Sequence, residues 1–90
     1  MDPAELKLDG NAIAGMLLDI FGREMTEEVT TCTTCRAEHP LGRLHVYSHG
    51  MGTVVRCASC GSVQMKVTSI RGTYLVDLRG VRLLQLRPTL

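Results

Sequence analysis

Hydrophobic residues between positions 10 and 21 recur with the spacing of one face of an α-helix. The apolar positions are Ile13, Met16, Leu17, Ile20 and Phe21. They follow i, i+3, i+4, i+7 and i+8, which places them on a single stripe. Asp9 is a suitable N-cap, and Gly22 suits the left-handed position after a helix end. The pattern predicts a helix over residues 10–21.

After this helix the pattern changes to short alternating segments that are typical of strands. Valine, threonine and tyrosine are frequent in them, as expected for β-structure. Ser48 to Gly52 and Arg71-Gly72 have the composition of turns, and the glycines of the first turn supply positive φ angles. The predicted strands cover residues 25–31, 44–47, 53–56, 63–70 and 73–78, and residues 81–86 are either a strand or a tail.

Four cysteines form two pairs with the spacing of metal-binding knuckles. Cys32 and Cys35 make one CxxC motif, Cys57 and Cys60 make the other, and 21 residues separate the motifs. Two intervening residues let the backbone fold around both sulfurs, so that each pair points at one ion. Gly61 follows the second pair and suits a positive φ there, whereas Arg36 makes the first knuckle less ideal. The sequence therefore predicts a metal site with four cysteine ligands.

Zinc is the metal that we favour for this site, because four thiolates in a tetrahedral arrangement suit Zn²⁺. A rubredoxin-like iron site has the same ligands and stays open, as do two disulfides and a redox dithiol. Four protein ligands leave no coordination position for a catalytic water, so we expect no enzymatic activity. The spacer histidines, His39, His45 and His49, are expected at the surface or in turns.

Composition explains why the chain needs such a site. It has 90 residues and three aromatic side chains, Phe21, Tyr47 and Tyr74. So short a chain buries a small core, and a metal commonly compensates for this. No apolar run is long enough for a membrane span, and the acidic start is unlike a signal peptide, so we expect a cytoplasmic protein. Cysteines in that reducing compartment favour metal over disulfides.

Charge is divided unevenly along the chain. Residues 1–31 carry seven acids and two bases, and residues 32–90 carry eight bases and two acids. The bases are candidates for a nucleic-acid-binding face. Two tyrosines provide little stacking surface, and four metal-bound thiolates would reduce the positive charge, so nucleic acid is an alternative partner and not the favoured one. Asp77 is expected to pair with Arg79 and not to act as a base. The bases in the second part are Arg36, Arg43, Arg56, Lys66, Arg71, Arg79, Arg82 and Arg87.

Several segments together resemble a family of small, uncharacterised bacterial zinc-ribbon proteins. They are Leu8 to Gly15, Phe21-Gly22, Met25-Thr26, the two cysteine pairs, His45 to Tyr47, Thr53 to Cys57 and Asp77 to Gly80. The resemblance covers residues 8–84 and implies that Cys32, Cys35, Cys57 and Cys60 are the ligands. It implies no activity. Genes of the family often neighbour oxidoreductase genes, which implies a redox-enzyme partner.

These observations predict a small α+β protein in which one N-terminal helix packs on a zinc ribbon. We expect a three- or four-stranded antiparallel sheet with both knuckles at hairpin ends. Residues 1–8 are predicted to be a flexible leader, residues 9–84 the zinc-ribbon domain and residues 85–90 a tail. The expected role is a non-enzymatic protein-interaction module that binds a protein partner, or forms a homodimer, through the helix. The alternatives are a nucleic-acid-binding ribbon and an iron electron-transfer protein.

Overall fold

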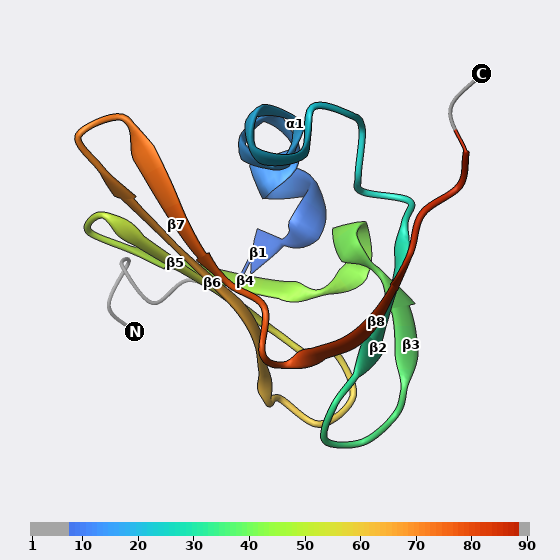
Figure 1. Cartoon of the computed structure of the whole chain (residues 1–90). Coiled ribbons are helices and arrows are strands. Elements are labelled where there is room, and N and C mark those ends of the chain that lie inside the picture. Colours follow the sequence, from blue (N-terminus) through green and yellow to red (C-terminus); the bar gives the residue numbers. More distant parts are fainter. Residues whose placement is uncertain (1–7, 89–90) are drawn as a thin grey trace.

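A computed structural model describes residues 8–88 and shows one α-helix with two antiparallel sheets (Figure 1). The five-stranded sheet has the order β1-β4-β5-β6-β7, and the three-stranded sheet has the order β3-β2-β8. The strands of the larger sheet are β1 (Leu8–Asp9), β4 (His45–His49), β5 (Gly52–Arg56), β6 (Val63–Ile70) and β7 (Thr73–Asp77). Those of the smaller sheet are β2 (Val29–Cys32), β3 (Glu38–Pro40) and β8 (Val81–Gln85).

The predicted helix is confirmed, with a tighter first turn. A 3-10 turn over Gly10–Ile13 leads into α1 (Ala14–Phe21). The Asp9 carboxylate accepts a hydrogen bond from the Asn11 N–H, and Gly22 ends the helix at φ 72°. Both ends therefore use the residues that the sequence indicates.

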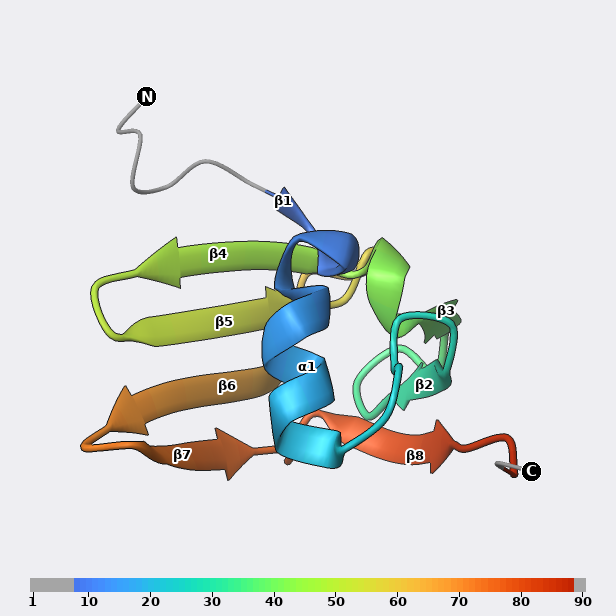
Figure 2. The same cartoon turned by 90° about the horizontal axis from the view of Figure 1, so that it is seen from above.

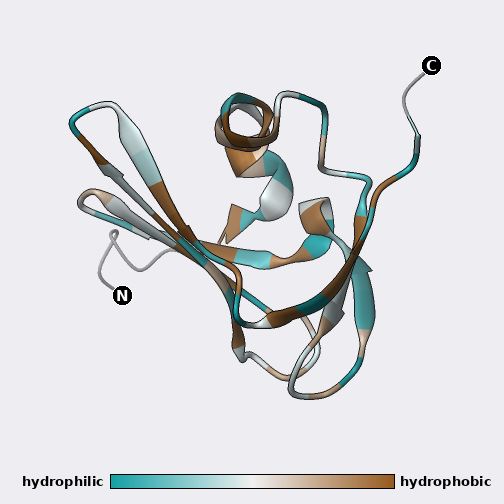
Figure 3. Cartoon of the chain, viewed as in Figure 1, coloured by the Kyte–Doolittle hydropathy of each residue, from teal (hydrophilic) through white to brown (hydrophobic). Residues whose placement is uncertain are grey.

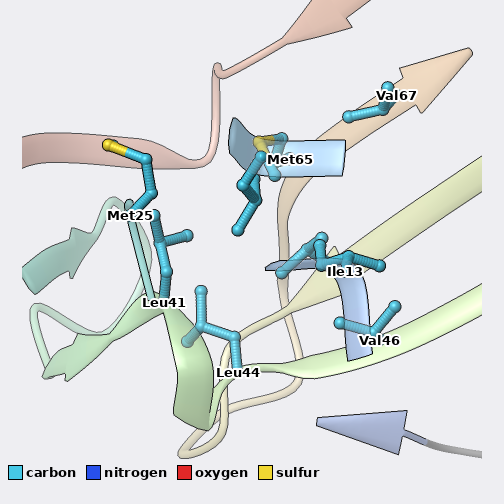
Figure 4. Close-up of a cluster of buried hydrophobic side chains, with 9 residues drawn as sticks. Ile13, Met25, Leu41, Leu44, Val46, Met65 and Val67 are labelled. Atoms are coloured by element: carbon cyan, nitrogen blue, oxygen red, sulfur yellow. The ribbon is translucent and has the colours of Figure 1, made fainter. Parts of the chain in front are cut away.

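The helix lies across the larger sheet, and the core forms between them (Figure 2). Leu17 of α1 is fully buried, and Met16, Ile20 and Phe21 pack against the same cluster. The apolar stripe is thus used in the core. The buried cluster consists of Ile13, Leu17, Met25, Leu41, Leu44, Val46, Val55, Met65 and Val67 (Figure 4).

The sheet prediction was wrong in size and in one strand start. Eight strands form two sheets where one sheet of three or four strands was expected. Residues 25–28 form a turn, in which the Glu28 N–H donates to the Met25 carbonyl, because the Met25 side chain is drawn into the core. Strand β3 and the 3-10 turn Leu41–Arg43 were not predicted, since they contain no alternating pattern.

The other hairpins follow the prediction closely. Strand β6 has the predicted bounds, β7 ends one residue early, and residues 81–85 form a strand that pairs with β2. The β4–β5 turn is shorter than expected, and Gly50 has a positive φ there while Gly52 lies in β5. The predicted leader lies outside the described residues except for Leu8, which pairs with Val46. The domain limits stay a prediction.

Candidate metal centre

The two CxxC segments fold into a pair of matching turns. Cys32 ends β2, and the turn returns to β3; Cys57 follows β5, and the turn returns to β6. In each turn the first cysteine's carbonyl accepts from the residue after the second cysteine: the Arg36 N–H donates to Cys32 at 3.1 Å and the Gly61 N–H to Cys57 at 3.0 Å. The matching pattern indicates that both segments present their sulfurs in the same way.

Arg36 and Gly61 adopt the same left-handed backbone, at φ 66° and φ 79° respectively. The positive φ was predicted for Gly61 and is confirmed. Arginine incurs a conformational cost there that glycine does not, so the first knuckle is the more strained of the two, as the sequence suggested.

The four sulfur atoms lie together at the distances that a tetrahedral metal requires. All four lie within 4.8 Å of one another. Cys32 Sγ is 3.7 Å from Cys60 Sγ, and Cys35 Sγ is 3.7 Å from Cys57 Sγ. A regular tetrahedron with metal–sulfur bonds of about 2.3 Å has edges of about 3.8 Å. Each of these short contacts joins one knuckle to the other, so the geometry fits a metal shared by both turns and not two disulfides.

Backbone N–H groups stabilise negative charge on the sulfurs. Burial disfavours the Cys32 thiolate, but the N–H groups of Cys35 and Thr34 donate to its sulfur and lower the pKa of Cys32 from 9.0 to about 6. The Ala37 N–H favours the Cys35 thiolate, but burial and the neighbouring sulfurs raise the pKa of Cys35 to about 12. Four thiolates this close repel one another, so a cation is needed to hold them all ionised.

The second cysteine of each pair is exposed, and the first is buried. Cys32 and Cys57 are each 1% exposed, whereas Cys35 and Cys60 face solvent. The Cys60 sulfur lies 3.2 Å from the Ser62 hydroxyl, and the Ser59 N–H donates to Cys57 Sγ. The site therefore lies at the surface, with hydrogen-bond donors around its sulfurs.

The three spacer histidines do not join the cysteine cluster. The metal-ligating group found among the described residues contains only the four cysteines. His39 Nε2 lies 2.8 Å from the Ser59 hydroxyl, so this ring contacts the second knuckle without reaching its sulfurs. His45 is half-buried in β4, and His49 is exposed at its end. His49 is therefore at the surface as expected, whereas His39 and His45 are half-buried in strands.

The turn between β7 and β8 supports both knuckles, and sequence reasoning missed it. The Gly80 carbonyl accepts from the Thr33 N–H at 3.0 Å, and the Gly80 N–H donates to the Gln64 carbonyl at 3.1 Å. Thr33 lies inside the first CxxC motif, and Gln64 lies in β6 just after the second. The signal in the sequence is a glycine between the predicted strand over residues 73–78 and the segment 81–86.

Several of the basic residues are bound within the protein. Asp77 and Arg79 form the expected ion pair at 2.6 Å, and the guanidinium and N–H of Arg79 lower the pKa of Asp77 to about 2. Arg87 pairs with Glu27 at 3.0 Å and with the buried Glu28 at 3.2 Å. The pairs of Arg87 join the acidic first part of the chain to the basic second part, and all of these pairs reduce the charge available to a nucleic acid.

Tyr47 and Tyr74 are both outside the apolar core. Tyr47 is half-buried, with the Arg56 guanidinium 5.9 Å from its ring centre, and Tyr74 is 36% exposed. The Arg56 guanidinium also donates to the Gly61 carbonyl, so it is held beside the second knuckle. A single tyrosine with one arginine above it is a small stacking surface.

Comparison with known proteins gives a family and no activity. A family model described as "Family of unknown function (DUF6510)" matches residues 2–89. Neither a curated protein nor a solved structure matches the chain. None of the helices in residues 8–88 is long and apolar enough to cross a membrane.

Proposed function

The chain belongs to this family of unknown function, and we propose that it is a small, non-enzymatic zinc-binding protein that acts as a protein-interaction module. Its four-cysteine site stabilises the fold of that module. The observation that carries the proposal is the set of four sulfurs within 4.8 Å of one another, contributed by two matching turns. We assign these hairpin-borne turns to a zinc-ribbon arrangement with Cys32, Cys35, Cys57 and Cys60 as ligands.

The closed ligand set supports a structural role. Four protein ligands fill the tetrahedral positions of Zn²⁺, whereas catalytic zinc sites keep one for water or substrate. The described part of the chain also places no histidine or carboxylate within the cluster. Each of the two short sulfur–sulfur contacts joins the turn of the smaller sheet to the turn of the larger sheet. A metal bound by all four sulfurs would therefore contribute to the folding free energy.

Metal analysis and the colour of the purified protein distinguish zinc from iron at this site. Iron in four thiolates gives a red protein, whereas the zinc protein is colourless. Metal analysis of protein purified from its native cell is the decisive measurement, because expression in another host exchanges the two metals. We expect one zinc per chain; one iron per chain would contradict the proposal and favour electron transfer.

The structural role is tested by removing the metal. We expect a chelator to change the far-UV circular dichroism spectrum from that of the folded protein to that of an unfolded chain. Adding zinc should restore the spectrum of the folded protein. Cys57→Ser should behave like the chelated protein, because a buried ligand is lost. His49→Ala is the control in the same spacer, because His49 is exposed at the end of β4, and it should bind zinc normally. An unchanged spectrum and melting temperature after complete metal removal would refute the role.

A protein surface is the partner that we propose, in preference to nucleic acid. The ion pairs of Arg79 and Arg87 leave fewer cations for phosphate. Nine large apolar side chains of the described residues are exposed, which favours protein contacts. A redox enzyme is the partner that the family resemblance supports, and the cytoplasm is the compartment that suits four reduced cysteines. A salt-dependent mobility shift on generic DNA or RNA at about 50 mM salt would contradict this choice.

A further inference from the structure

A groove of about 590 Å³ lies beside the 3-10 turn Leu41–Arg43, at the junction of the two sheets. This turn leads from β3 of the smaller sheet into β4 of the larger one (Figure 2). The volume is within the range of about 300–1,000 Å³ that is typical of small-molecule sites. The residues that line the groove include Asp9, Asn11, His39, Arg43, His45 and Ala58.

Close backbone contacts fix one wall of the groove. A Cβ on Gly10 would overlap the Leu41 carbonyl oxygen, and a Cβ on Gly42 would lie 3.0 Å from the Thr26 carbonyl oxygen. The Gly42 N–H donates to that same Thr26 carbonyl at 2.8 Å. The two 3-10 turns therefore pack through backbone atoms, and the groove is formed before a ligand arrives, which lowers the cost of binding.

The second knuckle forms part of the opposite wall. His39 Nε2 lies 2.8 Å from the Ser59 hydroxyl, and this contact fixes the orientation of the imidazole ring. Ala58, the neighbour of Ser59, belongs to the lining of the groove. Figure 3 shows hydrophilic colouring on β3 and near the start of β4, the strands that carry the two histidines. The groove thus lies next to the metal centre and has a polar lining.

Hydrogen-bond donors predominate in that lining. The Arg43 guanidinium carries five N–H groups, and the rings of His39 and His45 each carry at least one. Asp9 is the one carboxylate among the lining residues, and its side chain already accepts the Asn11 N–H at 3.1 Å. A ligand that satisfies these donors must therefore supply acceptor atoms.

The charges around the groove favour a negative ligand. Arg43 is exposed and pairs with no carboxylate within residues 8–88. Arg56 of β5 and Asp9 of β1 both lie opposite His45, so one positive and one negative charge flank that ring on the same face of the sheet. The charge of Arg43 is then the one without a counterpart. Its planar fork of N–H donors matches the paired oxygens of a phosphate or a carboxylate.

We propose that this groove binds the oxyanion group of a small molecule, a phosphate or a carboxylate, between Arg43 and the imidazoles of His39 and His45. The guanidinium supplies the charge and a bidentate contact, and the two imidazoles donate to the remaining oxygens from the smaller and the larger sheet. This site goes beyond the proposed function, because neither the metal centre nor protein binding assigns a task to these three side chains. Metal content and ligand binding are measured separately, so the failure of one is distinguishable from the failure of the other.

The test is a titration of the full, metal-loaded and isotope-labelled chain with sodium phosphate and, separately, with sodium succinate. Amide chemical shifts are followed by NMR at constant pH and ionic strength. We expect shifts that saturate and are concentrated on the lining residues with at least one of the two anions, with a Kd of about 1 mM or lower. Saturation with phosphate alone assigns a phosphate ligand, and saturation with succinate alone assigns a carboxylate ligand.

Two arginine variants locate the site. Arg43→Ala should weaken binding at least about tenfold, because its charge-assisted hydrogen bonds are lost. Arg82→Ala is the matched control, since Arg82 is exposed on β8 and does not line the groove, and it should bind like the wild type. Metal content and circular dichroism of the same samples show whether each variant is folded. Shifts that do not saturate with either anion up to about 50 mM, or a folded Arg43→Ala variant that binds as well as the wild type, would overturn the proposal.

Discussion

Gly80 is the position at which a single methyl group should disturb both knuckles. A Cβ built on Gly80 lies 1.9 Å from the Val63 carbonyl oxygen and 2.6 Å from Gln64 Cα. Both are backbone atoms, so no side-chain rotation relieves the clash. In Gly80→Ala the turn between β7 and β8 must move away from β6.

The magnitude follows from what that movement breaks. Gly80 makes two backbone hydrogen bonds, one from Thr33 and one to Gln64, and each contributes about 1 kcal/mol. Forcing a methyl group into a packed site costs about 1–3 kcal/mol. We expect Gly80→Ala to lower the free energy of unfolding by about 3–5 kcal/mol, a large share of the roughly 5–15 kcal/mol typical of a domain. Zinc affinity should fall too, since Thr33 lies within the first knuckle.

Gly15→Ala provides the matched control. Nothing lies within 4 Å of a Cβ at Gly15, which is exposed in α1. The same substitution there should raise stability by about 0.5–1 kcal/mol, because alanine restricts the unfolded chain. Urea unfolding of the zinc-loaded proteins, with zinc affinity from chelator competition, measures both variants. A Gly80→Ala protein within about 0.5 kcal/mol of wild type would refute the reasoning.

Two further predictions concern the knuckle backbone and the buried carboxylate. Arg36→Gly should raise the free energy of unfolding by about 1 kcal/mol, and Gly61→Ala should lower it by about as much, since both positions have positive φ. Urea unfolding measures both variants, and effects of equal sign would contradict this reasoning. Arg87→Ala should lower the melting temperature more than Arg82→Ala, because Glu28 is 2% exposed and loses the Arg87 guanidinium at 3.2 Å, keeping only the backbone N–H of residue 87 and Arg23 at 3.9 Å. The N–H and guanidinium of Arg87 hold the pKa of Glu28 below its usual value, so the penalty should be constant from neutral pH to about pH 5 and shrink as the pH falls through the lowered pKa. A penalty that grows on acidification would contradict the sign.

The helix and the two cysteine turns could be predicted from the sequence because local rules determine them. The stripe from Ile13 to Phe21, with Asp9 and Gly22 at its ends, specifies the helix within a short stretch of chain. The CxxC spacing determines each knuckle equally locally. Strand β6 was predicted for the same reason, since Val63, Met65 and Val67 alternate along it.

The second sheet could not be predicted because its pairings are distant in the sequence. β8 pairs with β2, and Leu84 lies opposite Thr30. Nothing in residues 81–86 specifies a partner so far away, so strand and tail were equally acceptable. β3 is formed because the first knuckle turns the chain back along β2, and Glu-His-Pro has no strand preference of its own.

The division into two sheets explains why the metal centre should matter so much to this fold. The helix-covered core takes its fully buried side chains from α1, the larger sheet and the nearby turns, and the smaller sheet adds only the partly buried Leu84. The smaller sheet is therefore attached to the larger one mainly by polar links: the hydrogen bond from the Gly80 N–H to the Gln64 carbonyl, the His39–Ser59 contact and the cysteines. One knuckle belongs to each sheet, and each 3.7 Å sulfur pair joins the two. A metal bound at that junction would supply the attraction that apolar burial does not provide, whereas without a metal the four crowded sulfurs repel one another as thiolates or remain neutral thiols.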